Sequence, residues 1–126
     1  MIDLHMHTTA SDGRSTPEEL VAEVASKGIR IMAVTDHDTI AGVAACQAAA
    51  RDAGVTCHVG IEITSVDHGR DVHVLGYGVD PTHVELGDFL TRQRLDRRRR
   101  LEEIGARLAQ LGVPIDLERA MVDAGR

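Results

Sequence analysis

Apolar and helix-forming stretches alternate along the first half of the chain, and this order strongly limits the possible folds. Apolar, β-branched runs at 1–7, 29–35 and 55–59 are predicted to be short buried strands. Helical periodicity is predicted for 17–28 and 40–53, which lie between those runs. Strands and helices in this order are typical of βαβ units, so we expect an α/β protein with a parallel sheet. The carboxyl ends of parallel strands meet at one rim, where such folds bind ligands.

The elements around this core have clear local signals. Thr16 and Glu19 form a capping box, and Pro17 takes the first helical position. After the third strand, 64–79 are predicted to form a hairpin with its turn in an Asp-His-Gly-Arg sequence. From Thr82 onward the chain is predicted to be helical.

Ligand-type side chains lie at or just beyond the end of each of the three predicted strands. They are His5 and His7 at the end of the first strand with Asp12 beyond it, Asp36, His37 and Asp38 after the second strand, and Glu62 after the third. Residues two apart in a strand point to the same face, so His5 and His7 would project together. A Ser-Asp-Gly turn would return Asp12 over the end of the strand. The alternative is an edge strand with two solvated histidines, followed by an ordinary turn.

Each remaining candidate also has two interpretations. His37 is either a metal ligand or a salt-bridged loop histidine, and Asp36 or Asp38 could orient it through its second ring nitrogen. Asp38 could equally be the N-cap of the following helix. Glu62 is favoured as a ligand over a salt bridge with an arginine, because a carboxylate after a buried strand is costly without a partner. His73, in the second arm of the hairpin, either joins the site or faces water.

Six candidate ligands exceed the four of a structural zinc site, which favours more than one ion. They are His5, His7, Asp12, His37, Glu62 and His73. A mixed set of imidazole and carboxylate suits Mn²⁺, Zn²⁺ or Fe²⁺, whereas Mg²⁺ and Ca²⁺ prefer oxygen alone. Adjacent ions can lower the pKa of a shared water to about 7 and neutralise the charge of a phosphate ester. The predicted reaction is therefore hydrolysis of a phosphate ester.

Composition excludes several other classes of protein. A net charge of −6 and only two tyrosine or phenylalanine residues in 126 argue against extended nucleic-acid binding. The one concentrated basic run, 92–100, is expected to be a solvated helix face, with a phosphate-binding patch as the alternative. No stretch approaches the ~20 apolar residues of a membrane span, so a cytoplasmic protein is expected. Cys46 and Cys57 are expected to be core or near-core thiols.

Three motifs, taken together in order and spacing, resemble those of the PHP (polymerase and histidinol phosphatase) superfamily. They are Asp3-Leu4-His5-Met6-His7-Thr8 with Ser11-Asp12-Gly13, Thr35-Asp36-His37-Asp38, and Gly60-Ile61-Glu62-Ile63. The resemblance implies metal ligation by His5, His7, Asp12, His37 and Glu62. Val72-His73-Val74-Leu75-Gly76-Tyr77 further resembles the stand-alone phosphoesterase branch, where the matching histidine is a ligand of a trinuclear site.

The resemblance also implies a fold and its limits. The family fold is a distorted (β/α)₇ barrel, so 1–81 are expected to form its first part and 82–126 to begin a helical insertion. Two later family motifs, a His-Pro and an Asp-x-His, have no counterpart after Glu85. The missing strands suggest pairing with the absent barrel half or with a second copy of the chain.

The function implied is a metal-dependent phosphoesterase acting on nucleotides or short oligonucleotides. Family members with such roles are 3′,5′-bisphosphate nucleotidases and 5′-3′ exoribonucleases, and two or three divalent ions are expected, with manganese favoured over zinc or iron. One alternative is a truncated, non-catalytic PHP module that binds metal or a partner. Another is a phosphomonoesterase similar to histidinol phosphatase.

Overall fold

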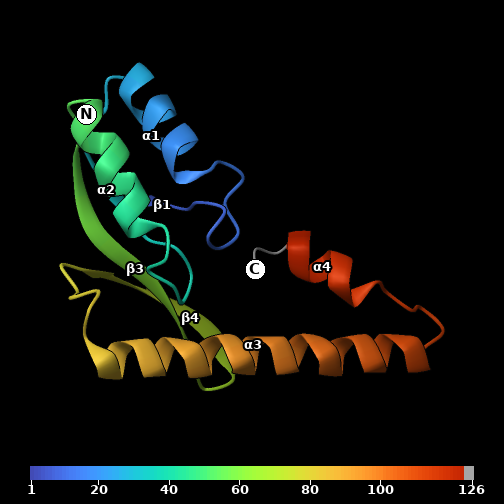
Figure 1. Cartoon of the computed structure of the whole chain (residues 1–126). Helices are drawn as coiled ribbons and strands as arrows, with labels where there is room; N and C mark the ends of the chain where they lie inside the picture. The colour runs from blue at the N-terminus through green and yellow to red at the C-terminus, as the bar shows by residue number, and fades with distance from the viewer. Residues whose placement is uncertain (124–126) are drawn as a thin grey trace.

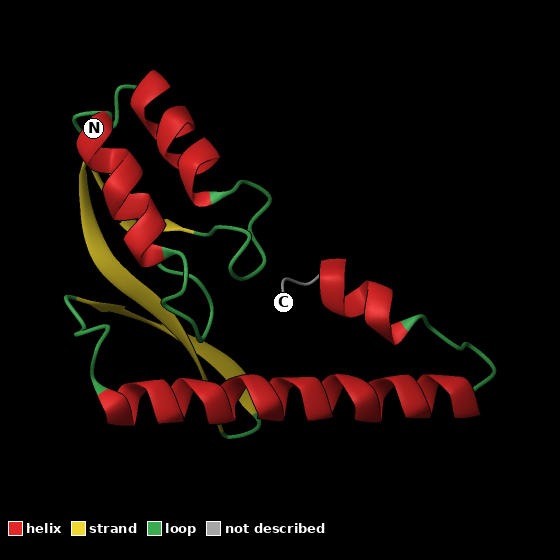
Figure 2. Ribbon diagram, in the orientation of Figure 1, coloured by secondary structure: helices red, strands yellow, loops and turns green. Residues whose placement is uncertain are grey.

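The computed structural model describes residues 1–123, which form a four-stranded sheet with helices on one face and across one end (Figures 1 and 2). The sheet order is β1-β2-β3-β4, in which β1, β2 and β3 are parallel and β4 is antiparallel to β3. The elements are β1 (Ile2–Met6), α1 (Pro17–Ser26), β2 (Ile31–Val34), α2 (Val43–Asp52), β3 (Thr56–Asp67), β4 (Arg70–Tyr77), α3 (Val84–Gln110) and α4 (Leu117–Asp123). The predicted βαβαβ order is confirmed.

The hydrophobic core lies between the parallel strands and the helix pair α1 and α2 (Figure 1). Val21 and Val24 of α1 and Cys46 of α2 pack there against Met32 and Val34 of β2. The predicted capping box is present: Thr16 accepts a hydrogen bond from the Glu19 amide, and the Glu19 carboxylate accepts one from the Thr16 amide. The local signals of the first helix therefore define its start correctly.

Strand β1 is more exposed than predicted. Ile2 is 59% exposed and Leu4 is 39% exposed, because β1 is an edge strand of the sheet. The prediction of a buried first strand is thus wrong for all of β1 except Met6. A break in the register with β2 lies between Asp3 and Met6, which is the segment that carries His5.

Strand β3 is longer than predicted and joins two parts of the fold. It passes through Gly60 and Glu62 into the hairpin with β4, whose predicted turn is confirmed by the pairing of Asp67 with Arg70. The sheet curls strongly, since the Tyr77 hydroxyl at the end of β4 donates a hydrogen bond to the Leu4 carbonyl in β1. This curled, half-barrel sheet brings the end of β4 next to β1.

Helix α3 crosses the β3–β4 hairpin (Figure 1). Gln93 donates a hydrogen bond to the Thr64 carbonyl of β3, and Arg100 pairs with Asp71 of β4. The sequence predicts a solvated helix face for this basic run. The structure differs, because Arg100 in the run pairs with the hairpin. At its other end, α4 returns over α3, where Leu117 packs directly on Gly105. None of the helices within 1–123 is long and apolar enough to cross a membrane.

Candidate metal centre

Four imidazoles and two carboxylates converge at the carboxyl end of the parallel strands. Neighbouring rings lie 4.8–5.1 Å apart, in the order His5, His7, His37, His73. Three groups of these side chains each bring their ligand atoms within 4.8 Å of one another: His5–His7–Glu62, His7–Asp12–His37 and His37–Glu62–His73. All six residues predicted as metal ligands belong to at least one group. Their role as ligands remains a prediction.

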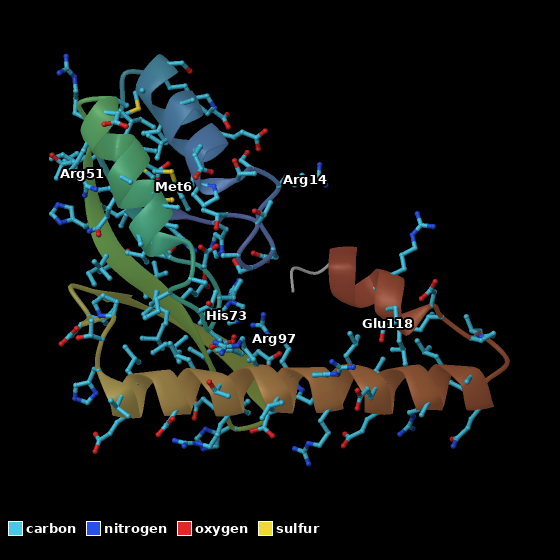
Figure 3. All side chains as sticks on the ribbon, viewed as in Figure 1. Met6, Arg14, Arg51, His73, Arg97 and Glu118 are labelled. Atoms are coloured by element: carbon cyan, nitrogen blue, oxygen red, sulfur yellow. The ribbon has the colours of Figure 1, made fainter. Side chains whose placement is uncertain are left out.

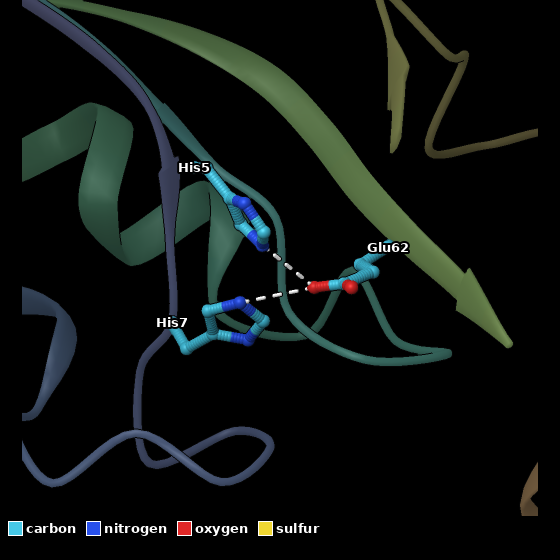
Figure 4. Close-up of side chains that lie close together, drawn as sticks. All are labelled: His5, His7 and Glu62. Atoms are coloured by element: carbon cyan, nitrogen blue, oxygen red, sulfur yellow. Dashed lines mark hydrogen bonds and ion pairs between the residues drawn. The ribbon is translucent and has the colours of Figure 1, made fainter. Parts of the chain in front are cut away.

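The Glu62 carboxylate is the centre of this cluster (Figure 4). Its Oε2 lies 2.8 Å from His5 Nε2 and 3.1 Å from His7 Nε2, while its Oε1 lies 2.9 Å from His73 Nδ1. Glu62 is 4% exposed, and among the described side chains the ionisable groups within hydrogen-bond distance of its carboxylate are all histidines. The alternative prediction, a salt bridge between Glu62 and an arginine, is wrong for the described residues.

Sheet register places His37 beside Glu62. The β2–β3 ladder continues as an isolated parallel bridge between these two residues, just beyond the end of β2. The Asp38 amide donates to the Glu62 carbonyl at 2.9 Å, and the Glu62 amide donates to the Asp36 carbonyl at 3.2 Å. Backbone hydrogen bonds thus fix the main chain at His37, and its ring Nε2 lies 3.6 Å from a carboxylate oxygen of Asp12 and of Glu62.

Asp36 holds the loop that carries Asp12. Its buried carboxylate accepts hydrogen bonds of 2.7 Å from the Thr8 amide, the Thr8 hydroxyl and the Ser11 hydroxyl. A methyl group at Gly42 would lie 2.8 Å from both the Asp36 carboxylate and the Thr8 hydroxyl, so the start of α2 closes over this network. The sequence alone did not predict that Thr8 and Ser11 donate hydrogen bonds to Asp36. The one sequence feature that could have indicated this role is that both are small polar residues close to His7 and Asp12.

Asp38 has a different task from the one predicted. Its carboxylate accepts from the Thr64 amide at 2.9 Å and pairs with Arg97 at 3.0 Å, so it joins the site loop to β3 and α3. The N-cap of α2 is Gly42, which rules out the N-cap interpretation of Asp38. Neither aspartate flanking His37 contacts its ring nitrogens, because both carboxylates have partners elsewhere.

The electrostatics of the cluster suit a cation. Nδ1 of His37 is buried without a hydrogen-bond partner within the described chain, and Nδ1 of His7, which makes no hydrogen bond either, lies 3.2 Å from Asp12 Oδ1. Burial lowers the pKa of His37, which outweighs the opposing effect of the Glu62 and Asp12 carboxylates. Burial alone would raise the pKa of Glu62, but the His5 hydrogen bond and the neighbouring imidazoles lower it. A neutral His37 imidazole beside the charged Glu62 carboxylate has the protonation state that a divalent metal requires of its ligands.

A family model for the PHP domain matches residues 3–112. The chain belongs to the PHP domain family. The predicted fold, the first part of a PHP barrel with helices alternating with parallel strands, agrees with solved PHP-related structures. An amidohydrolase from Chromobacterium violaceum, solved with bound sulfate and without metal, superposes with a TM-score of 0.90 at 34% identity, over 99% of this chain and 44% of that one.

Two curated relatives align with almost the whole of this PHP chain. A 5′-3′ exoribonuclease of Haemophilus influenzae is 39% identical over 96% of this chain and 45% of its own length. A 3′,5′-nucleoside bisphosphate phosphatase of Chromobacterium violaceum is 38% identical over 95% of this chain and 42% of its own length. The chain therefore spans less than half the length of these relatives.

Proposed function

We propose that this PHP chain forms part of a metal-dependent phosphoesterase that acts on phosphorylated nucleotides or short oligonucleotides. The observation that carries the proposal is the convergence of six imidazole and carboxylate side chains, grouped in sets with ligand atoms within 4.8 Å of one another. The names of the relatives, an exoribonuclease and a nucleoside bisphosphate phosphatase, support the substrate class. His5, His7, Asp12, His37, Glu62 and His73 are the proposed ligands of two or three divalent ions.

The residues of the chain would share the work as follows. Bound divalent ions supply Lewis acidity, which activates water and neutralises the charge of a phosphate ester. Glu62, the least exposed of the proposed ligands, belongs to two of the three groups and would contribute its carboxylate to both. Asp36 would keep the Asp12 loop rigid through Thr8 and Ser11. Manganese remains the favoured metal and the cytoplasm the expected location, and we propose that 82–126 begin a helical insertion after a barrel portion at 1–81.

The test uses the protein that contains these 126 residues, loaded with Mn²⁺, Zn²⁺ or Fe²⁺. Adenosine 3′,5′-bisphosphate, a short RNA and a chromogenic phosphodiester are offered as substrates. We expect turnover that is lost in His7→Ala and kept in His68→Ala, because His68 lies on the exposed hairpin turn and pairs only with Asp67. If the folded, metal-loaded protein hydrolyses none of these compounds, the proposal fails.

The exposed edge of β1 supports a second candidate role, that of a module completed by a partner. Ile2 and Leu4 leave apolar surface beside an unpaired strand edge, which favours pairing with further barrel strands or with a second copy. Light scattering on the 126-residue chain tests this role. Self-association that Leu4→Lys abolishes would support it, whereas a stable monomer without activity would contradict it.

A further inference from the structure

The candidate metal centre contains a row of four imidazoles, and the two ends of the row come from the two edge strands of the sheet. His5 of β1 begins the row and His73 of β4 ends it, with His7 and His37 between them. Figure 3 shows His73 where the hairpin passes α3, and Figure 4 shows His5 pointing toward Glu62 from β1. Since β1 and β4 are not neighbours in the sheet order, no ladder within the described chain fixes one end of the row relative to the other.

His5 is the most exposed of the six proposed ligands. Its side chain is 50% exposed, and its ring contacts the Glu62 carboxylate at 2.8 Å. The pairing of β1 with β2 is irregular between Asp3 and Met6, which is the segment around this histidine. The His5 amide donates to the side chain of Asp3, at 3.2 Å from Oδ1. A regular strand ladder therefore does not set the position of the main chain at His5.

The Tyr77 hydroxyl contacts the main chain at this irregular segment. It donates a hydrogen bond of 2.9 Å to the carbonyl of Leu4, which belongs to the same peptide group as the His5 amide. The main chain at Tyr77 is held in turn by β3, because Tyr77 pairs with Gly60 and the amide of the next residue donates to the Val59 carbonyl at 2.9 Å. The phenol thus connects a regularly paired strand end to the peptide group that precedes a proposed metal ligand.

We propose that Tyr77 is a positioning residue that holds His5 at its metal position. Within the described chain the Tyr77 hydroxyl donates to the Leu4 carbonyl and to no other group, so it acts through the main chain and not as a ligand. Tyr77 follows His73 by four residues in β4, so the strand that carries one end of the imidazole row also fixes the other end. The inference rests on the proposed function, in which these histidines bind metal.

The test replaces Tyr77 with phenylalanine, which removes the hydroxyl and keeps the ring. His5 belongs to one of the three groups able to hold an ion, together with His7 and Glu62. We expect Tyr77→Phe to lower the overall Mn²⁺ affinity, the product of the stepwise binding constants, by about 3- to 10-fold, the value of one net hydrogen bond. Competition against a chelating dye measures this affinity on the protein that contains these 126 residues.

A double-mutant cycle separates the positioning of His5 from general support of the fold. If Tyr77 acts through His5, Tyr77→Phe should have no further effect on Mn²⁺ affinity in a His5→Ala background. In an Asp12→Asn background the effect should persist, because Asp12 belongs only to a group that does not contain His5. Ser26→Ala is the matched control, since it removes a hydroxyl that donates to the main-chain carbonyl of Glu23 on α1, and it should leave the affinity unchanged.

Several results would overturn the inference. An unchanged Mn²⁺ affinity in Tyr77→Phe is one, and an equal loss in the His5→Ala background is another, because Tyr77 would then support the cluster as a whole. A Tyr77→Phe protein that circular dichroism shows to be unfolded would likewise assign this residue to the fold. These results leave the proposed function standing, whereas a wild-type protein that binds no metal would contradict both the metal centre and this inference.

Discussion

Replacing Glu62 with glutamine should empty two ion positions and spare a third. The substitution keeps the shape of the side chain and removes its charge at the centre of four imidazoles. Glu62 belongs to two of the three groups able to hold an ion, while the third consists of His7, Asp12 and His37. The matched variant, Asp12→Asn, removes a ligand from that third group alone.

The expected magnitude follows from the position of Glu62. Mutating a residue that only supports a metal ligand lowers metal affinity about 10- to 100-fold. Glu62 would contact the ions directly, so the loss at each of its two positions should reach at least about 100-fold, or roughly 2.7 kcal/mol. At Mn²⁺ concentrations that saturate the wild type, Glu62→Gln should therefore retain fewer ions per chain than Asp12→Asn.

The assay is metal content per chain after equilibrium dialysis, with affinities from competition against a chelating dye. Circular dichroism shows that each variant is folded, and His68→Ala controls for the loss of a histidine outside the cluster. The reasoning is refuted if folded Glu62→Gln keeps the wild-type metal content. It is also refuted if Asp12→Asn loses as many ions as Glu62→Gln.

Four further outcomes test the fold that holds the site. Gly60→Ala should cost about 1–3 kcal/mol in urea unfolding, because its methyl group would lie 2.6 Å from Thr35 Cγ2, and a neutral or stabilised protein would contradict this. Gly87→Ala, which meets open space on α3, should instead stabilise by up to about 1 kcal/mol. Burial raises the pKa of Cys46 to about 12, so Ellman's reagent at pH 8 should modify this thiol only after unfolding. Thr16→Ala should cost about 0.5–2 kcal/mol in the same unfolding assay through loss of the helix cap, and no change would refute that role.

Local chemistry was enough to predict the parts of the fold that depend on neighbours in sequence. The start of α1 follows from Thr16, Glu19 and Pro17, whose capping contacts span only a few residues. The hairpin turn between Asp67 and Arg70 is equally local. One topological rule was enough to predict that the ligand-type side chains meet at one rim. Parallel strands joined by helices all end on the same side of the sheet.

Partners distant in sequence explain what sequence reasoning missed. The sequence predicts that Asp36 or Asp38 orients His37 or that Asp38 caps a helix, yet the carboxylate of Asp36 bonds to Thr8 and that of Asp38 pairs with Arg97. Both aspartates are buried, and a buried carboxylate is stabilised by whichever donors the fold brings to it. No pattern in the sequence relates a loop aspartate to an arginine 59 positions later, so this contact required the docking of α3 on the hairpin.

The same long-range contacts make assembly of the site and formation of the sheet one event. The bridge between His37 and Glu62 is the last step of the β2–β3 ladder, and a shift of that ladder by one residue would turn the Glu62 carboxylate to the opposite face. Arg97 then joins α3 to this ladder through Asp38, the residue next to His37. The loop that carries His37, a proposed metal ligand, thus also holds α3 through Arg97, which links the docking of this helix to the geometry of the candidate metal centre.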